Sequence, residues 1–167
     1  MSREVRIVPA NWEHPKDEKG HFVPLFGDSF KKHVARWDEE ARQWENGFVR
    51  DFATDSHKPK GSKHTGAFAD WAGERPEEKD YMPDFSEAER THYQMYECTS
   101  EGTPISPVME TPEALARWLA DNNASAFADM GATYEEWLAT IKRGWALSAV
   151  ISPRTGLVSG VEWLCEK

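Results

Sequence analysis

The chain has 167 residues, of which 39% are hydrophobic and 12% aromatic, and its formal net charge is -9. This length suffices for one domain with a real core, and the 8 tryptophans can bury large areas, so we expect a globular protein and not a disordered one. No apolar run approaches the ~20 residues that a membrane span requires. The N-terminal stretch MSREVRIVPANW is charged and lacks a signal-peptide apolar core, so we expect a cytoplasmic protein.

The charge is distributed unevenly along the chain. Residues 1–63 carry 12 basic and 11 acidic groups, residues 64–100 carry 3 and 9, and residues 101–167 carry 5 and 9. The middle and C-terminal parts would repel phosphates, so we expect no direct binding to nucleic acid. A protein partner with a basic surface is compatible with this charge.

The first expected elements are a strand and a helix. Residues 3–9 alternate charged and apolar side chains and predict a short edge strand that ends at Pro9, and residues 20–27 predict an extended segment across the core. Asp28 and Ser29 then resemble a helix N-cap. An apolar stripe at heptad-like spacing predicts a helix packed on its own domain, or alternatively the seam of a homodimer. The stripe consists of Phe30, Val34, Trp37, Ala41, Trp44 and Phe48.

Residues 49–85 have the least regular pattern. Several prolines, glycines and scattered aromatic residues predict a long loop-rich connection with one short helical turn. Residues 92–98 predict a strand that is covered on both faces, because aromatic side chains occupy both alternating sets.

Two helices and a hairpin follow. Thr111 with Pro112 predicts the start of a helix over 111–122, and Thr133 with Glu136 forms a capping-box pattern for a second helix over 133–144. Residues 145–151 and 157–163 predict two strands joined by a turn over 152–156. We therefore expect a single α+β domain over residues 1–167, in which a small antiparallel sheet of three to four strands packs against about three helices.

No metal or cofactor motif is present in the sequence. The six histidines form neither an HExxH pattern nor a close cluster with cysteines, although His14 and His21 could approach each other across the N-terminal loop. We expect no metal and no cofactor. Cys98 and Cys165 are far apart, and we expect both to be reduced and buried.

The polar turn over residues 99–107 is the best candidate for a functional loop. Hydroxyls and free amides ahead of a helix can hold an anion, but these groups can equally satisfy their own backbone. Trp12 and Trp71 lie in predicted loops and could mark a surface patch for binding. The candidate binding residues are Thr99, Ser100, Glu101, Gly102, Thr103, Ser106, Trp12 and Trp71.

Three stretches carry a resemblance to a known group of proteins. They are VPANWEHPKDEKGHFVPLF, ERTHYQMYECTSEGTPISPVMETPEALARWLADN and TYEEWLATIKRGWALSAVISPRTGLVSGVE. Through them the chain resembles a group of small uncharacterised proteins encoded by tailed phages and prophages. The resemblance implies a phage gene product in a bacterial cytoplasm and carries over no catalytic residue.

These observations favour an acidic interaction protein that binds a host or phage protein, including as an inhibitor of a host defence or nucleic-acid enzyme. Two alternatives remain open. One is a small enzyme that uses the 99–107 loop with His92, or with His14 and His21. The other is a structural or assembly role in the virion, which the apolar stripe would suit in an oligomer.

Overall fold

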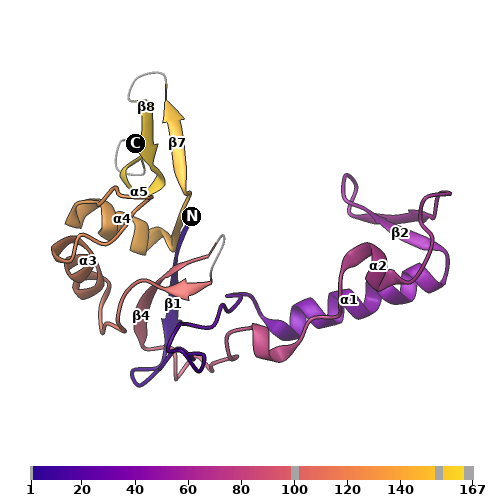
Figure 1. The fold of residues 1–167 in the computed structure, drawn as a ribbon, viewed down its shortest axis with the longest axis horizontal. Helices are drawn as coiled ribbons and strands as arrows, with labels where there is room; N and C mark the ends of the chain where they lie inside the picture. Colours follow the sequence, from indigo (N-terminus) through magenta and orange to yellow (C-terminus); the bar gives the residue numbers. More distant parts are fainter. Residues whose placement is uncertain (1, 99–101, 153–155, 164–167) are drawn as a thin grey trace. The chain divides into compact units, whose positions relative to one another are not determined.

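The computed structural model describes residues 2–98, 102–152 and 156–163. The chain forms two compact units (Figure 1). The first unit comprises residues 1–27 and 85–167, and the second comprises residues 28–84. Helices and antiparallel strands occur together, which confirms the α+β class. That both units belong to a single domain stays a prediction.

The first unit is built on a four-stranded antiparallel sheet with the order β5-β4-β1-β6. Its strands are β1 Arg3–Val8, β4 His92–Glu97, β5 Thr103–Pro104 and β6 Trp145–Ala146. β1 pairs with β4 along its whole length and with β6 through Arg3 and Glu4. The prediction of an edge strand at residues 3–9 was therefore wrong.

The two arginines of β1 explain this difference. Arg3 is 1% exposed, and its Nε donates a hydrogen bond of 2.8 Å to the carbonyl oxygen of Ser125. Arg6 is 7% exposed and donates to the carbonyl oxygen of Leu25 at 3.0 Å. Alternating charge suggests a strand open to water, but guanidinium groups can be buried where they find partners. Ser125 lies 122 positions from Arg3 and Leu25 lies 19 positions from Arg6, so neither contact has a local pattern in the sequence.

The helices α3 Pro112–Asp121 and α4 Tyr134–Arg143 begin where the capping patterns predict. The Thr111 hydroxyl accepts a hydrogen bond of 3.0 Å from the amide of Ala114. The Thr133 hydroxyl accepts from the amide of Glu136, and the Glu136 carboxylate accepts from the amide of Thr133 at 2.8 Å. Both predicted helix starts are confirmed, because each depends on contacts within one turn.

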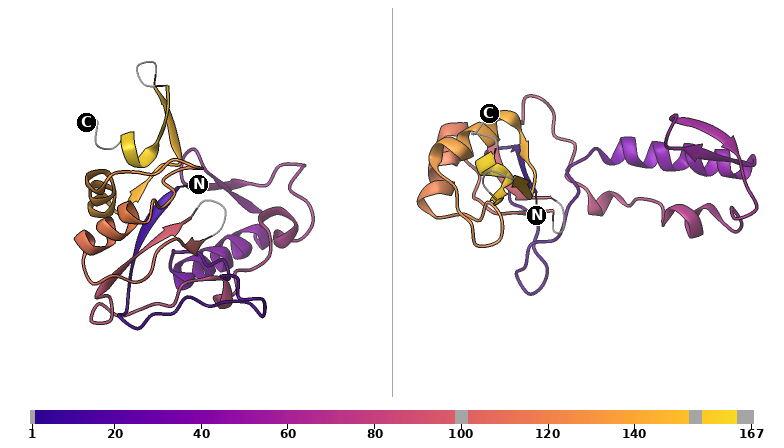
Figure 2. Two further views of the ribbon diagram at one scale, coloured as in Figure 1. Left: turned by 60° about the vertical axis from the view of Figure 1, so that its left-hand side comes forward. Right: turned by 90° about the horizontal axis from the view of Figure 1, so that it is seen from above.

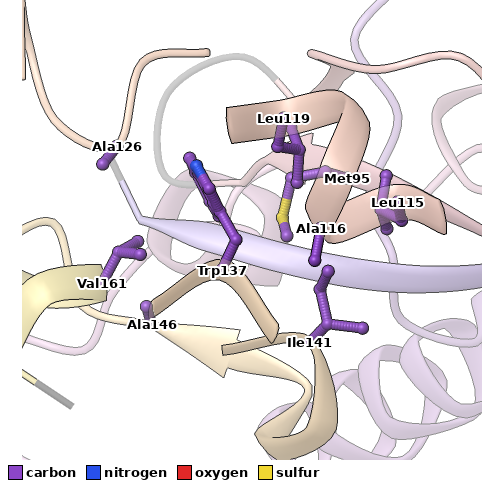
Figure 3. Packing of buried hydrophobic residues seen from close by; sticks show 9 residues of the cluster. All are labelled: Met95, Leu115, Ala116, Leu119, Ala126, Trp137, Ile141, Ala146 and Val161. Carbon is purple, nitrogen blue, oxygen red and sulfur yellow. The ribbon is translucent and has the colours of Figure 1, made fainter. Parts of the chain in front are cut away.

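The hydrophobic core of the first unit lies between these helices and the sheet (Figure 3). Trp137 of α4 is fully buried and packs with side chains from α3, β4 and β6. The buried cluster consists of Met95, Leu115, Ala116, Leu119, Ala126, Trp137, Ile141, Ala146 and Val161. This packing fixes β4 in place from one side and leaves its other side to the N-terminal segment.

The C-terminal part differs from its predicted pattern. β7 Ala149–Ser152 pairs with β8 Gly156–Ser159, and a short helix, α5 Gly160–Trp163, replaces the predicted continuation of the second strand. A Cβ on Gly160 would lie 2.0 Å from the carbonyl oxygen of Leu147, so this glycine permits a close backbone contact. The Ser159 hydroxyl accepts from the amide of Glu162 at 3.1 Å and so caps the new helix. Residues 153–155 of the predicted turn lie outside the described residues.

The predicted burial of both cysteines is not upheld for Cys98. This side chain is exposed and free, and its Sγ lies 3.0 Å from Oγ of Ser2. It directly follows β4, where the chain leaves the covered part of the sheet. Cys165 lies outside the described residues.

The second unit contains α1 Phe30–Glu45, β2 Phe48–Asp51, β3 Ser56–Pro59, α2 Phe68–Ala72 and the 3-10 helix η1 Glu78–Asp80. Residues 49–85 thus hold a paired hairpin and two helical segments where a loop-rich connection with one helical turn was predicted. α1 confirms the predicted helix, although its N-cap Ser29 makes no side-chain capping bond.

The returning chain of the second unit runs alongside α1 (Figure 2), and aromatic side chains of the apolar stripe contact it. Phe30 contacts Tyr81 with ring centroids 5.6 Å apart. Nε1 of Trp37 donates to the carbonyl oxygen of Gly73, and Nε1 of Trp44 donates to that of Gly66, each at 3.1 Å. Successive aromatic residues seven positions apart thus hold successive parts of the returning chain, which explains why the heptad-like spacing occurs in a single helix.

One buried hydroxyl in α4 generates a stability prediction. Thr140 is fully buried, and no described residue reaches its Oγ1. Thr140→Val keeps the side-chain shape and removes this hydroxyl, so we expect the free energy of unfolding to rise by about 1 kcal/mol. Thr133→Val, at the N-cap of the same helix, is the matched control. Loss of the cap should lower the free energy of unfolding by about 1 kcal/mol. Urea unfolding, followed by circular dichroism, measures the free energy of unfolding of both variants. A clear loss of stability in Thr140→Val would contradict the conclusion that the Thr140 hydroxyl has no hydrogen-bond partner.

Candidate functional site

The N-terminal segment after β1 folds back on itself beside the sheet. The amide of Asp17 donates to the carbonyl oxygen of His21 at 2.8 Å, and that of Val23 donates to Pro15 at 3.0 Å. The amide of Leu25 then donates to the carbonyl oxygen of Gly102 at 3.1 Å. A Cβ on Gly102 would lie 2.4 Å from the oxygen of Leu25, so only glycine allows the two strands of backbone to meet.

A hydrogen-bonded cluster around the Tyr96 hydroxyl attaches this segment to β4. Nε1 of Trp12 donates to Oη of Tyr96 at 3.1 Å, and Oη of Tyr96 donates to Oε1 of Gln94 at 2.9 Å. Nδ1 of His14 lies 3.1 Å from the same hydroxyl. Nε2 of Gln94 donates to the carbonyl oxygen of Ser106 at 2.9 Å and so extends the cluster to the segment after β5.

The tautomer of His14 follows from its partners. Nε2 lies 2.7 Å from the carbonyl oxygen of Val23, which can only accept, so Nε2 carries a proton. In the neutral ring Nδ1 is then an acceptor, and it competes with Gln94 for the single proton of Tyr96. Burial lowers the pKa of His14, and the charge of Arg6 lowers it further, while the bond to Val23 acts in the opposite direction.

Tyr96 is itself held in its neutral form. Burial raises the pKa of Tyr96 to about 12, and the hydrogen bond from Trp12 only partly opposes this effect. The guanidinium of Arg6 lies 4.1 Å from the centre of the Tyr96 ring and adds a cation–π contact. The Tyr96 hydroxyl and the His14 ring are therefore uncharged at neutral pH, and the cluster forms a floor of hydrogen-bonded groups.

A groove of about 880 Å³ lies beside this floor, and we call it the aromatic groove. Its walls come from the N-terminal segment, the segment after β5 and one side chain of α3. It is lined by Trp12, Glu13, His14, Pro15, Lys16, Phe22, Gln94, Pro104, Ile105, Ser106, Pro107, Val108 and Trp118. Tryptophan, phenylalanine, proline and aliphatic side chains make up eight of these thirteen residues, and a concave surface of this kind is typical of a binding site.

The predicted site residues are distributed over several places. Trp12 and Ser106 line the aromatic groove, whereas Thr99, Ser100 and Glu101 lie outside the described residues. Gly102 packs on Leu25, and Thr103 of β5 pairs with Glu97 of β4, so both have backbone roles. Trp71 lies in the second unit.

Among the described residues, the Ser106 hydroxyl and three of the histidines considered for an enzyme have partners within the chain. The Ser106 hydroxyl accepts from the amide of Met95 and donates to the carbonyl oxygen of Pro107, each at 2.9 Å. Nδ1 of His92 bonds to the hydroxyl of Thr91. His21 is 77% exposed and pairs with Asp17, whereas His14 bonds to Tyr96, so the structure gives these two histidines different partners.

In the described part of the chain, no three histidine, cysteine, aspartate or glutamate side chains gather in a way that could hold a metal ion. Of the helices in that part, none combines the length and the apolar character needed to cross a bilayer. No protein-family model, no curated protein and no solved structure matches the chain.

Sequence reasoning missed Tyr96, Gln94, Phe22 and Trp118 as parts of a site. A signal was available in part: Gln94 and Tyr96 alternate on one face of a strand, and Trp12 and His14 have the same spacing. Nothing local in the sequence indicates that these two pairs meet. Phe22 joins them because the N-terminal segment turns back, placing its ring 5.5 Å from that of His14.

The lowered pKa of His14 predicts a pH-dependent stability. The unfolded chain takes up a proton at His14 near pH 6.5, whereas the folded chain does so only at a lower pH. The stabilisation is thus fully present above about pH 6.5 and is lost as the pH falls through the folded pKa. We expect the difference in unfolding free energy between the wild type and His14→Gln to shrink between about pH 7.5 and pH 5.5.

The measurement is urea unfolding at a series of pH values, with His21→Gln as the control. His21 is 77% exposed and lies in the same segment, so its replacement controls for the removal of an imidazole without the buried contacts of His14. A difference between wild type and His14→Gln that stays constant over this pH range would show that His14 titrates alike in both states.

Proposed function

We propose that this protein is an acidic interaction protein whose aromatic groove binds a segment of a protein partner with a basic surface. The observation that carries the proposal is the groove itself. Most of its lining residues are aromatic, proline or aliphatic, and its polar floor is satisfied by bonds within the chain. Such a surface can bury apolar groups of a partner without leaving its own polar groups unpaired.

The charge of the first unit supports a basic partner. Its sequence carries 16 acidic and 10 basic side chains. At the groove, Glu13 and Lys16 offer one charge of each sign, so attraction comes from the unit as a whole and not from a charged pocket. A field of this kind accelerates association with a positively charged surface and weakens as salt rises.

The setting of this function belongs to the same proposal. The chain resembles phage and prophage proteins, and we propose that it acts in the cytoplasm of a bacterial host on a host or phage protein. An enzyme whose basic surface normally holds nucleic acid has the required charge. Inhibition of such an enzyme, by occupation of that surface, is the role that we propose.

Phe22 offers a direct test of the groove. This side chain is 41% exposed at the groove wall, and Phe26, which is 63% exposed, lies outside the groove. We expect selection from a random-peptide library on the immobilised protein to yield peptides rich in lysine, arginine and apolar residues. Phe22→Ala should weaken their binding by about tenfold, and Phe26→Ala should leave it unchanged.

Salt provides the second readout of this experiment. Raising sodium chloride from about 50 to about 500 mM should weaken the binding of these peptides, because screening reduces the attraction between opposite charges. The proposal fails if no selected peptide depends on Phe22. It fails equally if the peptides that depend on Phe22 are acidic, or if they bind as well at high salt as at low salt.

A further inference from the structure

The second unit contains a cavity of about 430 Å³ that the proposed function does not use. Side chains from α1, the β2–β3 hairpin and α2 surround it, and we call it the Trp71 cavity. Its aromatic lining consists of Trp44, Phe48, Phe52, Phe68 and Trp71. All of these residues belong to the second unit, so the cavity is complete within it.

The aromatic rings form a fixed base with an exposed edge. Trp44 is only 4% exposed. Its ring stacks on that of Trp71, with centroids 5.9 Å apart, and its centroid lies 5.8 Å from that of the Phe68 ring. Trp71 is 49% exposed, Phe52 is 76% exposed and Phe48 is 39% exposed. Single exposed apolar residues are ordinary, but three large rings around one cavity mark a contact surface. Rigid aromatic side chains are also the commonest hot spots of binding.

The charged groups in the cavity wall are paired with one another. The Glu40 carboxylate accepts from Nε of Arg36 at 3.0 Å and from the Arg50 guanidinium at 2.9 Å. Nε of Arg50 also donates to Asp55 at 3.1 Å. Because these charges already have partners, a ligand that enters the cavity has no charge to neutralise there. The part that enters must therefore be apolar or aromatic.

The β2–β3 hairpin and the residues that follow it, 48–66, carry four basic side chains against two acidic ones. Arg50 and Lys58 pair with Asp55 and Asp51, so the excess positive charge comes from Lys60 and Lys63, which follow β3. Lys60 also lies over the Trp44 ring, 4.0 Å from its centre. A partner with carboxylates on either side of its entering residue would therefore be attracted to Lys60 and Lys63.

From these contacts we infer that the Trp71 cavity is a second docking site, which takes a large apolar or aromatic side chain from an acidic segment of a protein partner. This partner differs in charge from the one that the aromatic groove binds, so the protein has two sites for two kinds of segment. Single-stranded nucleic acid would also offer negative charge and flat rings. However, a site for single-stranded nucleic acid follows the backbone with a continuous basic groove, whereas both arginines of this cavity wall are paired with Glu40.

The experiment measures peptide binding to the full-length protein by fluorescence anisotropy. The probe is a short labelled peptide with tryptophan and leucine at its centre and glutamates on both sides. A version with lysines in place of the glutamates and a labelled oligothymidylate are the comparisons. We expect the glutamate peptide to bind most tightly of the three.

Trp145 supplies the matched control variant, because it is 47% exposed and lies in the first unit. Trp71→Ala and Phe52→Ala should each raise the dissociation constant of the glutamate peptide by about tenfold, and Trp145→Ala should leave it unchanged. Phe52 is the more exposed of the two and contacts Arg50, so its replacement tests the cavity without removing the Trp44 stack.

Three results would overturn the inference. They are equal or tighter binding of the lysine peptide, tighter binding of the oligothymidylate, and insensitivity of the glutamate peptide to both cavity variants. None of these results bears on the aromatic groove, whose ligands are recognised by their dependence on Phe22.

Discussion

The buried hydroxyl of Tyr96 is the constraint on which the candidate site depends. A phenol that is removed from water needs partners, because an unpaired buried hydroxyl costs about 1–3 kcal/mol. Trp12, His14 and Gln94 supply them from two segments more than eighty residues apart in the chain. The same bonds hold the N-terminal segment beside β4, so the aromatic groove is formed before any ligand arrives. A preformed groove lowers the ordering cost of binding.

The two units use aromatic side chains in different ways. In the first unit, Trp137 is sealed in the core, and the groove rings lie over a hydrogen-bonded floor. In the second unit, the rings of α1 hold the returning chain, and part of the set remains exposed around the Trp71 cavity. The high aromatic content therefore stabilises two small cores and also supplies two candidate contact surfaces of unlike charge.

Elements defined by local contacts could be predicted from the sequence, and those defined by distant contacts could not. Thr111 and Thr133 mark the starts of α3 and α4 because each cap is complete within one turn. β1 was predicted at the edge of the sheet and lies inside it. The alternating charge was misleading because Arg3 is buried against Ser125, 122 positions away. For the site, Trp12 and Trp71 were indicated because they lie in segments predicted as loops, although Trp71 belongs to helix α2. The meeting of Trp12 with Tyr96 has no local signature in the sequence.

Photo-crosslinking tests the central claim most directly. A benzophenone amino acid placed at position 22, in the groove wall, is compared with the same group at position 26, outside the groove. After irradiation in a bacterial lysate, we expect the group at position 22 to form adducts with basic proteins. High salt and the selected basic peptides should each suppress these adducts, and the group at position 26 should form none of them. Equal labelling from both positions, or labelling of acidic proteins and nucleic acid from position 22, would contradict the central claim.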